Sequence, residues 1–121
     1  MSIRVEPDMV ERTAATFGSG TLIGYHTDLG VRIVTVDPVI ESDGTMTITG
    51  VSGTLMDALA VDPRATIVWQ PTVRHGWTLV VDGLARPTGS DAIVVETTSA
   101  MLHRPSSHSD GPAWEWPERD D

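Results

Sequence analysis

The chain has 121 residues, no cysteine and a formal net charge of -9, because 17 acidic residues outnumber 8 basic ones. A chain of this size forms one domain that buries about two thirds of its unfolded surface, and its acidity argues against a nucleic-acid partner. The missing cysteines exclude disulfides, thiolate nucleophiles and Cys-ligated zinc. Every basic residue is Arg, so Schiff-base chemistry and a Lys phosphate anchor are excluded as well. A bound anion must therefore be held by Arg, backbone N–H groups or hydroxyls.

The hydrophobic share of 40% is that of a globular protein. No apolar run approaches the roughly 20 residues of a membrane-spanning helix, so no membrane partner is expected. The N-terminal stretch lacks the basic flank and apolar block of a signal peptide. We therefore expect a cytoplasmic protein.

The first expected element is a helix that begins at Glu6-Pro7-Asp8, with Pro at the first helical position and acids in the first turn. Val10, Ala14 and Phe17 share one face of it. Gly18 ends it. Six strands are then expected, at residues 21–27, 31–36, 45–49, 65–70, 77–85 and 92–97, because β-branched and alternating apolar residues there are bounded by turn-forming residues.

A second helix lies between the third and fourth of these strands. Thr54 with Asp57 three residues later predicts its start, and Asp62-Pro63 predicts its end. Between these signals Leu55, Ala58 and Leu59 recur at helical spacing. A short helix therefore leads into the hairpin of the fourth and fifth strands, where Trp77, Leu79 and Val81 are expected to face the core.

The composition changes after residue 105. Residues 106–121 contain mainly Ser, His, Pro, Gly and acidic residues, with Trp114 and Trp116 as their large apolar groups. We expect residues 1–105 to form the folded domain and residues 106–121 to form an extended C-terminal tail. Six short strands and two short helices favour a small, mostly antiparallel β-barrel.

The central segment also resembles a known family. A hydroxyl-rich turn, a short helix, the run Asp-Pro-Arg-Ala-Thr, a strand ending in Trp69 and a strand ending in Asp-Gly-Leu-Ala resemble the FMN-binding split barrels related to pyridoxamine 5'-phosphate oxidase. The likeness covers roughly residues 5 to 105. It implies a six-stranded antiparallel split barrel that forms a homodimer, with cofactor sites in the clefts between subunits. The run Val31–Val36, apolar on both faces apart from Arg32 and Thr35, fits such burial.

The turn before the second helix is the candidate phosphate site. A helix N-terminus with glycines and hydroxyls presents unpaired N–H groups and the positive end of the helix dipole. In the resembling family this turn holds the flavin phosphate and commonly carries Lys, where Gly53-Thr54 stands here. Phosphate binding and a plain helix cap both remain open. The residues assigned to the phosphate are Thr49, Ser52, Gly53 and Thr54.

By the same resemblance, an adjacent strand holds the isoalloxazine ring. The backbone of Arg32, Ile33, Val34 and Thr35 is expected along the ring edge, and Thr78 takes a position where flavin-binding relatives often place a polar residue. Arg32 either pairs with the phosphate or is an ordinary solvated strand residue.

Other side chains that could bind a ligand or take part in a reaction have simpler explanations. Trp69 and Trp77 stack on a planar ring or on each other, or pack in the core, where we expect at least one of them. The segment His103–Pro105 is expected to pack back on the barrel, from where Arg104 would reach an anionic ligand. Asp57 and Asp82 are interpreted as helix-start and strand-face residues. Neither the histidine spacing nor the serine context matches a metal or nucleophile motif.

Two functions follow. The first is a flavoprotein that binds FMN, or the deazaflavin F420, and acts as an oxidoreductase on an unknown small molecule, the cofactor supplying the chemistry. The second is a non-catalytic split-barrel dimer that has lost the flavin and binds another small ligand or a protein partner. The absence of Lys favours the second, and the Gly-hydroxyl turn favours the first.

Overall fold

The computed structural model describes residues 1–118, which form an eight-stranded antiparallel sheet and short helical segments. The long strands are β2 (Gly20–His26), β3 (Gly30–Val36), β6 (Arg64–Trp69), β7 (Thr78–Pro87) and β8 (Ile93–His103). The short strands are β1 (Ser2–Arg4), β4 (Val39–Ile40) and β5 (Met46–Ile48). The helical segments are η1 (Pro7–Met9), α1 (Val10–Ala14), α2 (Gly53–Val61) and η2 (Ser106–His108).

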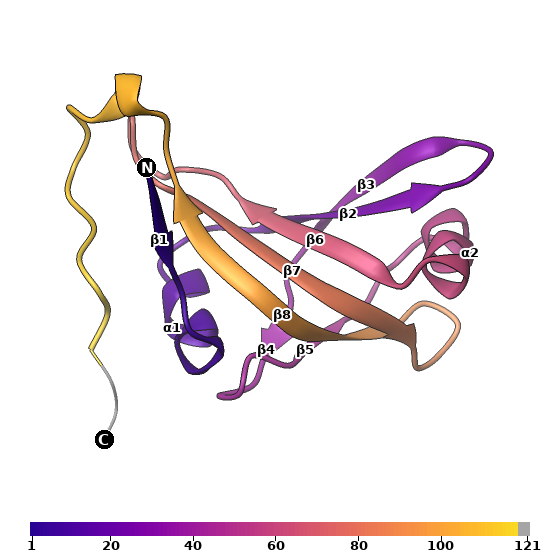
Figure 1. Ribbon diagram of the computed structural model, residues 1–121. Coiled ribbons are helices and arrows are strands. Elements are labelled where there is room, and N and C mark those ends of the chain that lie inside the picture. The colour runs from indigo at the N-terminus through magenta and orange to yellow at the C-terminus, as the bar shows by residue number, and fades with distance from the viewer. Residues whose placement is uncertain (119–121) are drawn as a thin grey trace.

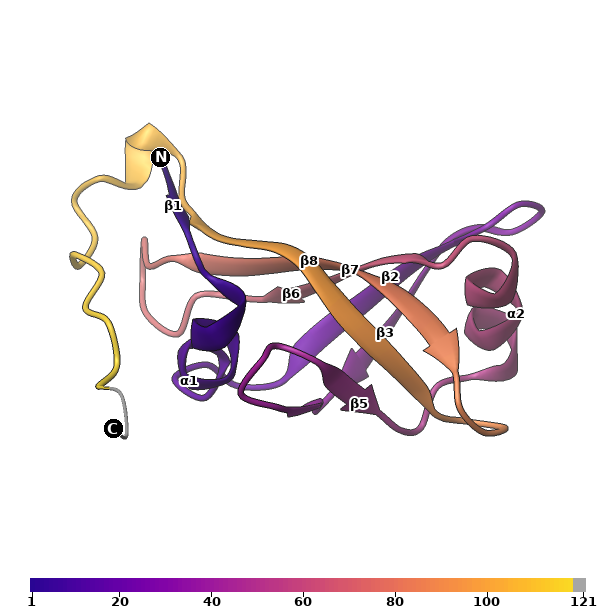
Figure 2. The ribbon, with the colours of Figure 1, turned by 60° about the horizontal axis from the view of Figure 1, so that its bottom comes forward.

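The strands follow the order β3-β2-β6-β7-β8-β5-β4, and β1 pairs with β8 off this path. The sheet curls strongly into an open half-barrel, with α1 and α2 at opposite ends of it (Figures 1 and 2). Because the path is not closed, β3 and β4 remain edge strands. The predicted mostly β, antiparallel fold with short helices is confirmed.

The concave face of the sheet, called the inner face here, carries the core. Leu22, Ile67 and Val81 are partners across β2, β6 and β7, and all three are fully buried. Their neighbours along each strand point to the opposite, outer face, because side chains alternate along a strand. The predicted inward positions Leu79 and Val81 are confirmed by this pattern.

Helix α2 covers one end of the inner face. Its Leu55 and Leu59 are buried against Gly24 of β2, where a Cβ atom would lie 2.6 Å from Leu55 Cδ1. The helix begins two residues earlier than the predicted cap at Thr54 implies. Its N-cap is Ser52, whose Oγ accepts from the Leu55 N–H at 3.4 Å, so the prediction of Thr54 as the capping residue is wrong. Asp62 ends the helix, as predicted.

Several boundaries differ from prediction. All six predicted strands exist, but the sixth continues to His103, and the two-residue β4 and the three-residue β1 were not predicted. These short strands contain too few residues to show the alternation of apolar and polar side chains from which strands are predicted. The first helix is shorter than its sequence signals indicated, a single 3-10 turn followed by α1. No helix among residues 1–118 has the length and apolar character needed to cross a bilayer.

The tail contains η2, and no further helix or strand occurs from residue 109 to 118. The last three residues of the predicted tail lie outside the described residues. The division into a domain and a tail at residue 105 stays a prediction.

Candidate functional site

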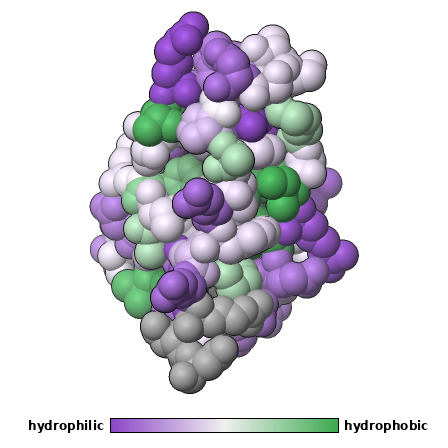
Figure 3. Space-filling view, turned by 90° about the vertical axis from the view of Figure 1, so that its left-hand side faces the viewer, coloured by the Kyte–Doolittle hydropathy of each residue, from purple (hydrophilic) through white to green (hydrophobic). Residues whose placement is uncertain are grey.

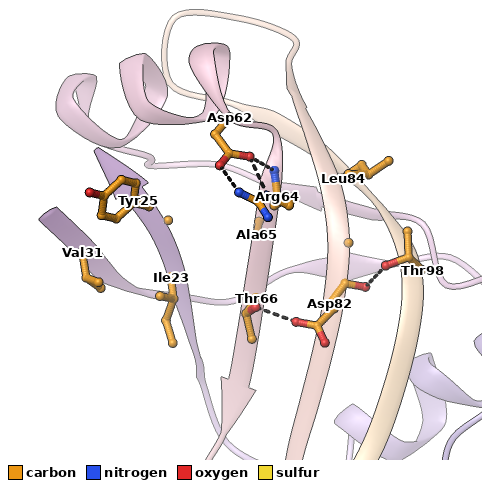
Figure 4. A pocket seen from close by; sticks show the side chains of 12 residues that line it. Ile23, Tyr25, Val31, Asp62, Arg64, Ala65, Thr66, Asp82, Leu84 and Thr98 are labelled. Carbon is orange, nitrogen blue, oxygen red and sulfur yellow. Dashed lines mark hydrogen bonds and ion pairs between the residues drawn. The ribbon is translucent and has the colours of Figure 1, made fainter. Parts of the chain in front are cut away.

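A groove of about 500 Å³ lies on the outer face, between the β2–β3 hairpin and strands β6 to β8 (Figure 4). One wall is apolar and consists of Ile23, Tyr25 and Val31. Ile23 is the cross-strand partner of Ile33, and Tyr25 that of Val31, so these four side chains share the outer face. Leu84 forms part of the opposite wall.

The floor of the groove is polar and centres on Asp82. Thr66 Oγ1 donates to Asp82 Oδ1 at 2.6 Å, and Ser99 Oγ donates to Asp82 Oδ2 at 3.5 Å. Thr98 Oγ1 donates to the Asp82 carbonyl oxygen at 3.1 Å. The carboxylate therefore accepts hydroxyls from two different strands, which orients it at the base of the groove. Figure 4 shows the contacts of Asp82 with Thr66 and Thr98.

A β-bulge produces this arrangement. The register of β7 against β8 shifts between Asp82 and Gly83, so that Asp82 pairs with Ser99 and Gly83 pairs with Thr97. A bulge re-aims side chains along the bulged strand. Here it leaves Thr98 unpaired, with its hydroxyl directed to the Asp82 backbone.

An ion pair forms one corner of the groove. Arg64 Nε and Nη2 lie 3.0 and 2.8 Å from the two carboxylate oxygens of Asp62, a two-point contact. The side-chain hydrogen bond from Arg64, with the Arg64 backbone N–H second, lowers the pKa of Asp62 to about 2. Both side chains are charged at neutral pH. Arg64 is 83% exposed, so water screens the pair and it contributes little to stability.

The predicted phosphate turn lies at the N-terminus of α2. The Ser52 hydroxyl is engaged as the helix cap, and Thr49 is exposed in the loop that follows β5. Within residues 1–118, no hydrogen bond uses the N–H of Gly53 or Thr54. Two backbone donors at the N-terminus of a nine-residue helix therefore remain available.

Arg32 lies on the inner face, on the same side as α2. Its cross-strand partner is Gly24, which packs against Leu55 in the first turn of α2. Arg32 as a whole is half-buried, but its guanidinium donates from Nη1 to the Val31 carbonyl in an exposed hydrogen bond of 3.2 Å and has no carboxylate partner among residues 1–118. Arg32 therefore lies on the face of the sheet that α2 covers, one strand away from the glycine that packs against the helix.

The remaining predicted ring-binding residues are spread over both faces. Val34 is on the inner face, whereas Ile33 and Thr35 are exposed on the outer face. Thr78 lies on β7, three strands from β3, or roughly 14 Å across the sheet. Within a single subunit, Thr78 therefore lies too far from β3 to share a ring-binding site with it. Because β3 is an edge strand, alternate backbone N–H and C=O groups along it have no neighbouring strand.

Other predictions are settled by burial. Trp69 is 2% and Trp77 is 9% exposed, so core packing is confirmed for both. Arg104 does pack back on the body, but its guanidinium lies over the Trp77 ring instead of facing a ligand. No group of three or more metal-ligating side chains occurs among residues 1–118.

Sequence reasoning missed most residues that line the groove. Asp82 was interpreted only as a strand-face residue, and the roles of Tyr25, Arg64 and Thr66 were not predicted. The available signal was modest: Thr66 and Asp82 are polar residues at outward positions of strands that are otherwise apolar. Their proximity depends on strand pairing, which the sequence does not state.

No protein-family model and no curated protein sequence matches this chain. Several solved structures are similar in shape, and two of them are described here. One is an F420 reductase, with 14% identity over 78% of this chain and 94% of that chain, at a TM-score of 0.56. The other is a FAD-binding protein from Mesorhizobium loti, with 9% identity over 84% of this chain and 96% of that chain, at a TM-score of 0.54.

The fold is a flavin-binding-type split barrel. The predicted fold class is thereby confirmed. At these identities the likeness concerns the path of the chain alone.

Proposed function

We propose that this split barrel binds a flavin-type cofactor, FMN or F420, and serves as an oxidoreductase for a small molecule. The observation that carries the proposal is that two available backbone donors at a helix N-terminus and Arg32 lie on the same face of the sheet, and that the Arg32 guanidinium has no carboxylate partner among residues 1–118. Backbone donors at a helix start and an Arg side chain are two of the phosphate ligands that a chain without Lys can provide. The names of the two similar structures, an F420 reductase and a FAD-binding protein, support the same class of cofactor.

The residues present fit such a group. The N–H groups of Gly53 and Thr54 would hold the phosphate together with Arg32, and the free backbone groups of β3 would hydrogen-bond the edge of the ring. A bound flavin or deazaflavin supplies hydride or electron transfer, while the chain supplies binding and orientation. Kinship with the pyridoxamine 5'-phosphate oxidase group is part of this proposal.

We also propose that the protein works as a homodimer. Val31 is 59% and Ile33 is 66% exposed on the outer face, so the predicted burial of both faces of β3 is not met within one chain. Tyr25 and Leu84 on the same face are also exposed, at 53% and 45%. A second copy packed on this face would cover these side chains. It would also complete a cleft to which Thr78 of the other subunit belongs.

Glycine at the first position of α2 allows a direct test of the phosphate site. Ser52 has φ -65° and ψ 155°, a conformation compatible with a following proline, and proline is well tolerated at the first helical position. Gly53→Pro therefore removes one proposed donor and preserves the helix. Gly53→Ala is the matched control, because it keeps the N–H and its Cβ meets no atom within 4 Å.

Dialysed protein would be titrated with FMN and, separately, with F420, followed by absorbance and by tryptophan fluorescence. We expect saturable binding of one of them near one ligand per subunit. Loss of one charge-assisted hydrogen bond to the phosphate is expected to weaken binding roughly 10- to 150-fold in Gly53→Pro and to leave Gly53→Ala unchanged. Equal affinities of these two variants would remove the phosphate assignment, and absence of binding to either ligand would remove the flavin function.

The second candidate is a non-catalytic split barrel. It is favoured by the Ser52 hydroxyl, which is already engaged as the helix cap, and by the absence of Lys. A dimeric protein that binds neither FMN nor F420 at tens of micromolar would support it.

A further inference from the structure

The segment after β8 folds back along the body. Residues 105–118 run beside β1 and α1 in both views (Figures 1 and 2), and the face that they occupy mixes hydrophilic residues with separate hydrophobic ones (Figure 3). Trp114 stacks on Phe17, with ring centroids 6.2 Å apart and an interplanar angle of 20°. Trp116 meets the Trp114 ring edge-on at 5.8 Å. We call residues 105–118 the strap.

Arg104 is the anchor of the strap. It is 7% exposed, and its guanidinium carbon lies 4.2 Å from the centre of the Trp77 ring. Nη1 donates to the carbonyl oxygens of His75 at 3.2 Å and Pro112 at 2.8 Å. Trp77 Nε1 donates to the same Pro112 oxygen at 3.3 Å. One side chain thus joins β8, the β6–β7 loop and the strap.

A pair of histidines forms the second attachment. The rings of His75 and His108 stack face to face, with centroids 3.9 Å apart and an interplanar angle of 7°. His75 Nδ1 also lies 2.7 Å from Asp110 Oδ1. Gly111 follows directly and leaves no room for a Cβ beside the His75 carbonyl. The β6–β7 loop and the strap therefore fit closely at these residues.

The docked strap creates a pocket of about 420 Å³. Phe17, Val73 and Trp77 line it from the body, and Pro112, Trp114 and Glu115 line it from the strap. The pocket therefore exists only while the strap is in place.

Several charged groups lie around the histidine pair. Asp110 is the carboxylate in contact with the pair, and its hydrogen bond to His75 holds the pKa of Asp110 below the usual range. The positive groups nearby are the Arg104 guanidinium, bonded to the His75 carbonyl, and the N-terminal ammonium of Met1, which donates to the Arg104 carbonyl at 2.9 Å. Arg74 precedes His75 in the same loop.

We propose that the strap is released by acid, when both stacked histidines become protonated and repel each other. One protonated ring is compatible with the stack, because Asp110 compensates its charge. A second proton places two positive rings face to face beside Arg104, with one carboxylate in contact with the pair. Histidine is the side chain whose ordinary charge change lies in the physiological pH range, so the test spans pH 8 to pH 5. Release dismantles the strap pocket and exposes Phe17.

The test uses the full chain labelled with 5-fluorotryptophan and fluorine NMR from pH 8 to pH 5. The Trp114 signal is assigned by its loss in Trp114→Phe. We expect it to move from a packed to a solvent-exposed position as the pH falls, while the signal of buried Trp69 stays in place. His108→Phe keeps an aromatic ring that cannot be protonated, and we expect no transition in it. His103→Phe, at an exposed histidine outside the stack, should behave like the wild type.

An unmoved Trp114 signal down to pH 5 in the wild type overturns the proposal, as does the same transition in His108→Phe. Movement of the Trp69 signal at the same pH would show global unfolding and overturns it too. If His108→Phe fails to dock the strap at pH 8, His108→Gln takes its place with the same expectation.

Discussion

Gly83 of β7 lies directly against the backbone of Glu96 on β8. A Cβ atom at position 83 would come within 2.5 Å of the Glu96 carbonyl oxygen and 2.6 Å of Val95 Cγ1. The β-bulge that leaves Thr98 unpaired beside Asp82 lies next to this glycine. The floor of the groove therefore depends on a residue without a side chain.

Gly83→Ala is expected to destabilise the fold. The neighbouring atom is backbone and cannot swing aside, so the two central strands have to separate, at a cost of about 1–3 kcal/mol or more in the free energy of unfolding. Urea unfolding followed by fluorescence of the buried tryptophans measures this. Gly89→Ala is the control, since its Cβ would meet its nearest atom at 4.0 Å. Equal midpoints for the two variants would contradict the packing argument.

Ile33→Glu is expected to separate the proposed dimer. It places a charge at the centre of the exposed apolar group on the outer face, where burial against a second copy would leave that charge unpaired. Sedimentation velocity at micromolar concentration should change from dimer to monomer. Val61→Glu adds the same charge at a residue that is 74% exposed at the end of α2, and it should remain dimeric. A monomeric wild type would refute the dimer itself.

Arg32→Gln is expected to weaken binding of the flavin-type ligand. Loss of a charge-assisted hydrogen bond costs about 1.5–3 kcal/mol, which corresponds to a roughly 10- to 150-fold higher Kd. Arg86→Gln removes the same charge from an exposed position on β7 and serves as the control for a general electrostatic effect. If both variants bind like the wild type, Arg32 is an ordinary strand residue.

Arg64→Gln is expected to raise the pKa of Asp62 from about 2 toward the usual value of an Asp side chain, about 3.9, because the hydrogen bond from Arg64 is the main cause of the lowered pKa. A lowered carboxyl pKa stabilises the fold above the unfolded value, and this contribution disappears as the pH falls from about 4 to about 2. A carboxyl-carbon NMR titration of Asp62 in the two proteins measures the shift. An unchanged midpoint would show that Arg64 does not hold the carboxylate in solution.

Local signals were enough to predict most elements. Period-two alternation identified the inward residues Leu79 and Val81, and helical spacing identified the buried Leu55 and Leu59. The cap of α2 was misplaced by two residues, because Thr54 and Ser52 are both good capping residues. Only the backbone geometry distinguishes them, since Ser52 is extended and its Oγ accepts from the Leu55 N–H.

The groove and the strap required the tertiary structure. Thr66 and Asp82 are 16 residues apart, and Arg104 meets the carbonyl of His75 across 29 residues. Such contacts depend on strand register and on the curl of the sheet, which are decided by the packing of many side chains at once. The sequence by itself determined where apolar and polar residues alternate along the strands. It also determined which kinds of side chain could bind an anion, and it excluded Lys and Cys chemistry. The tertiary structure alone decided which polar groups meet, because that depends on non-local pairing across the half-barrel.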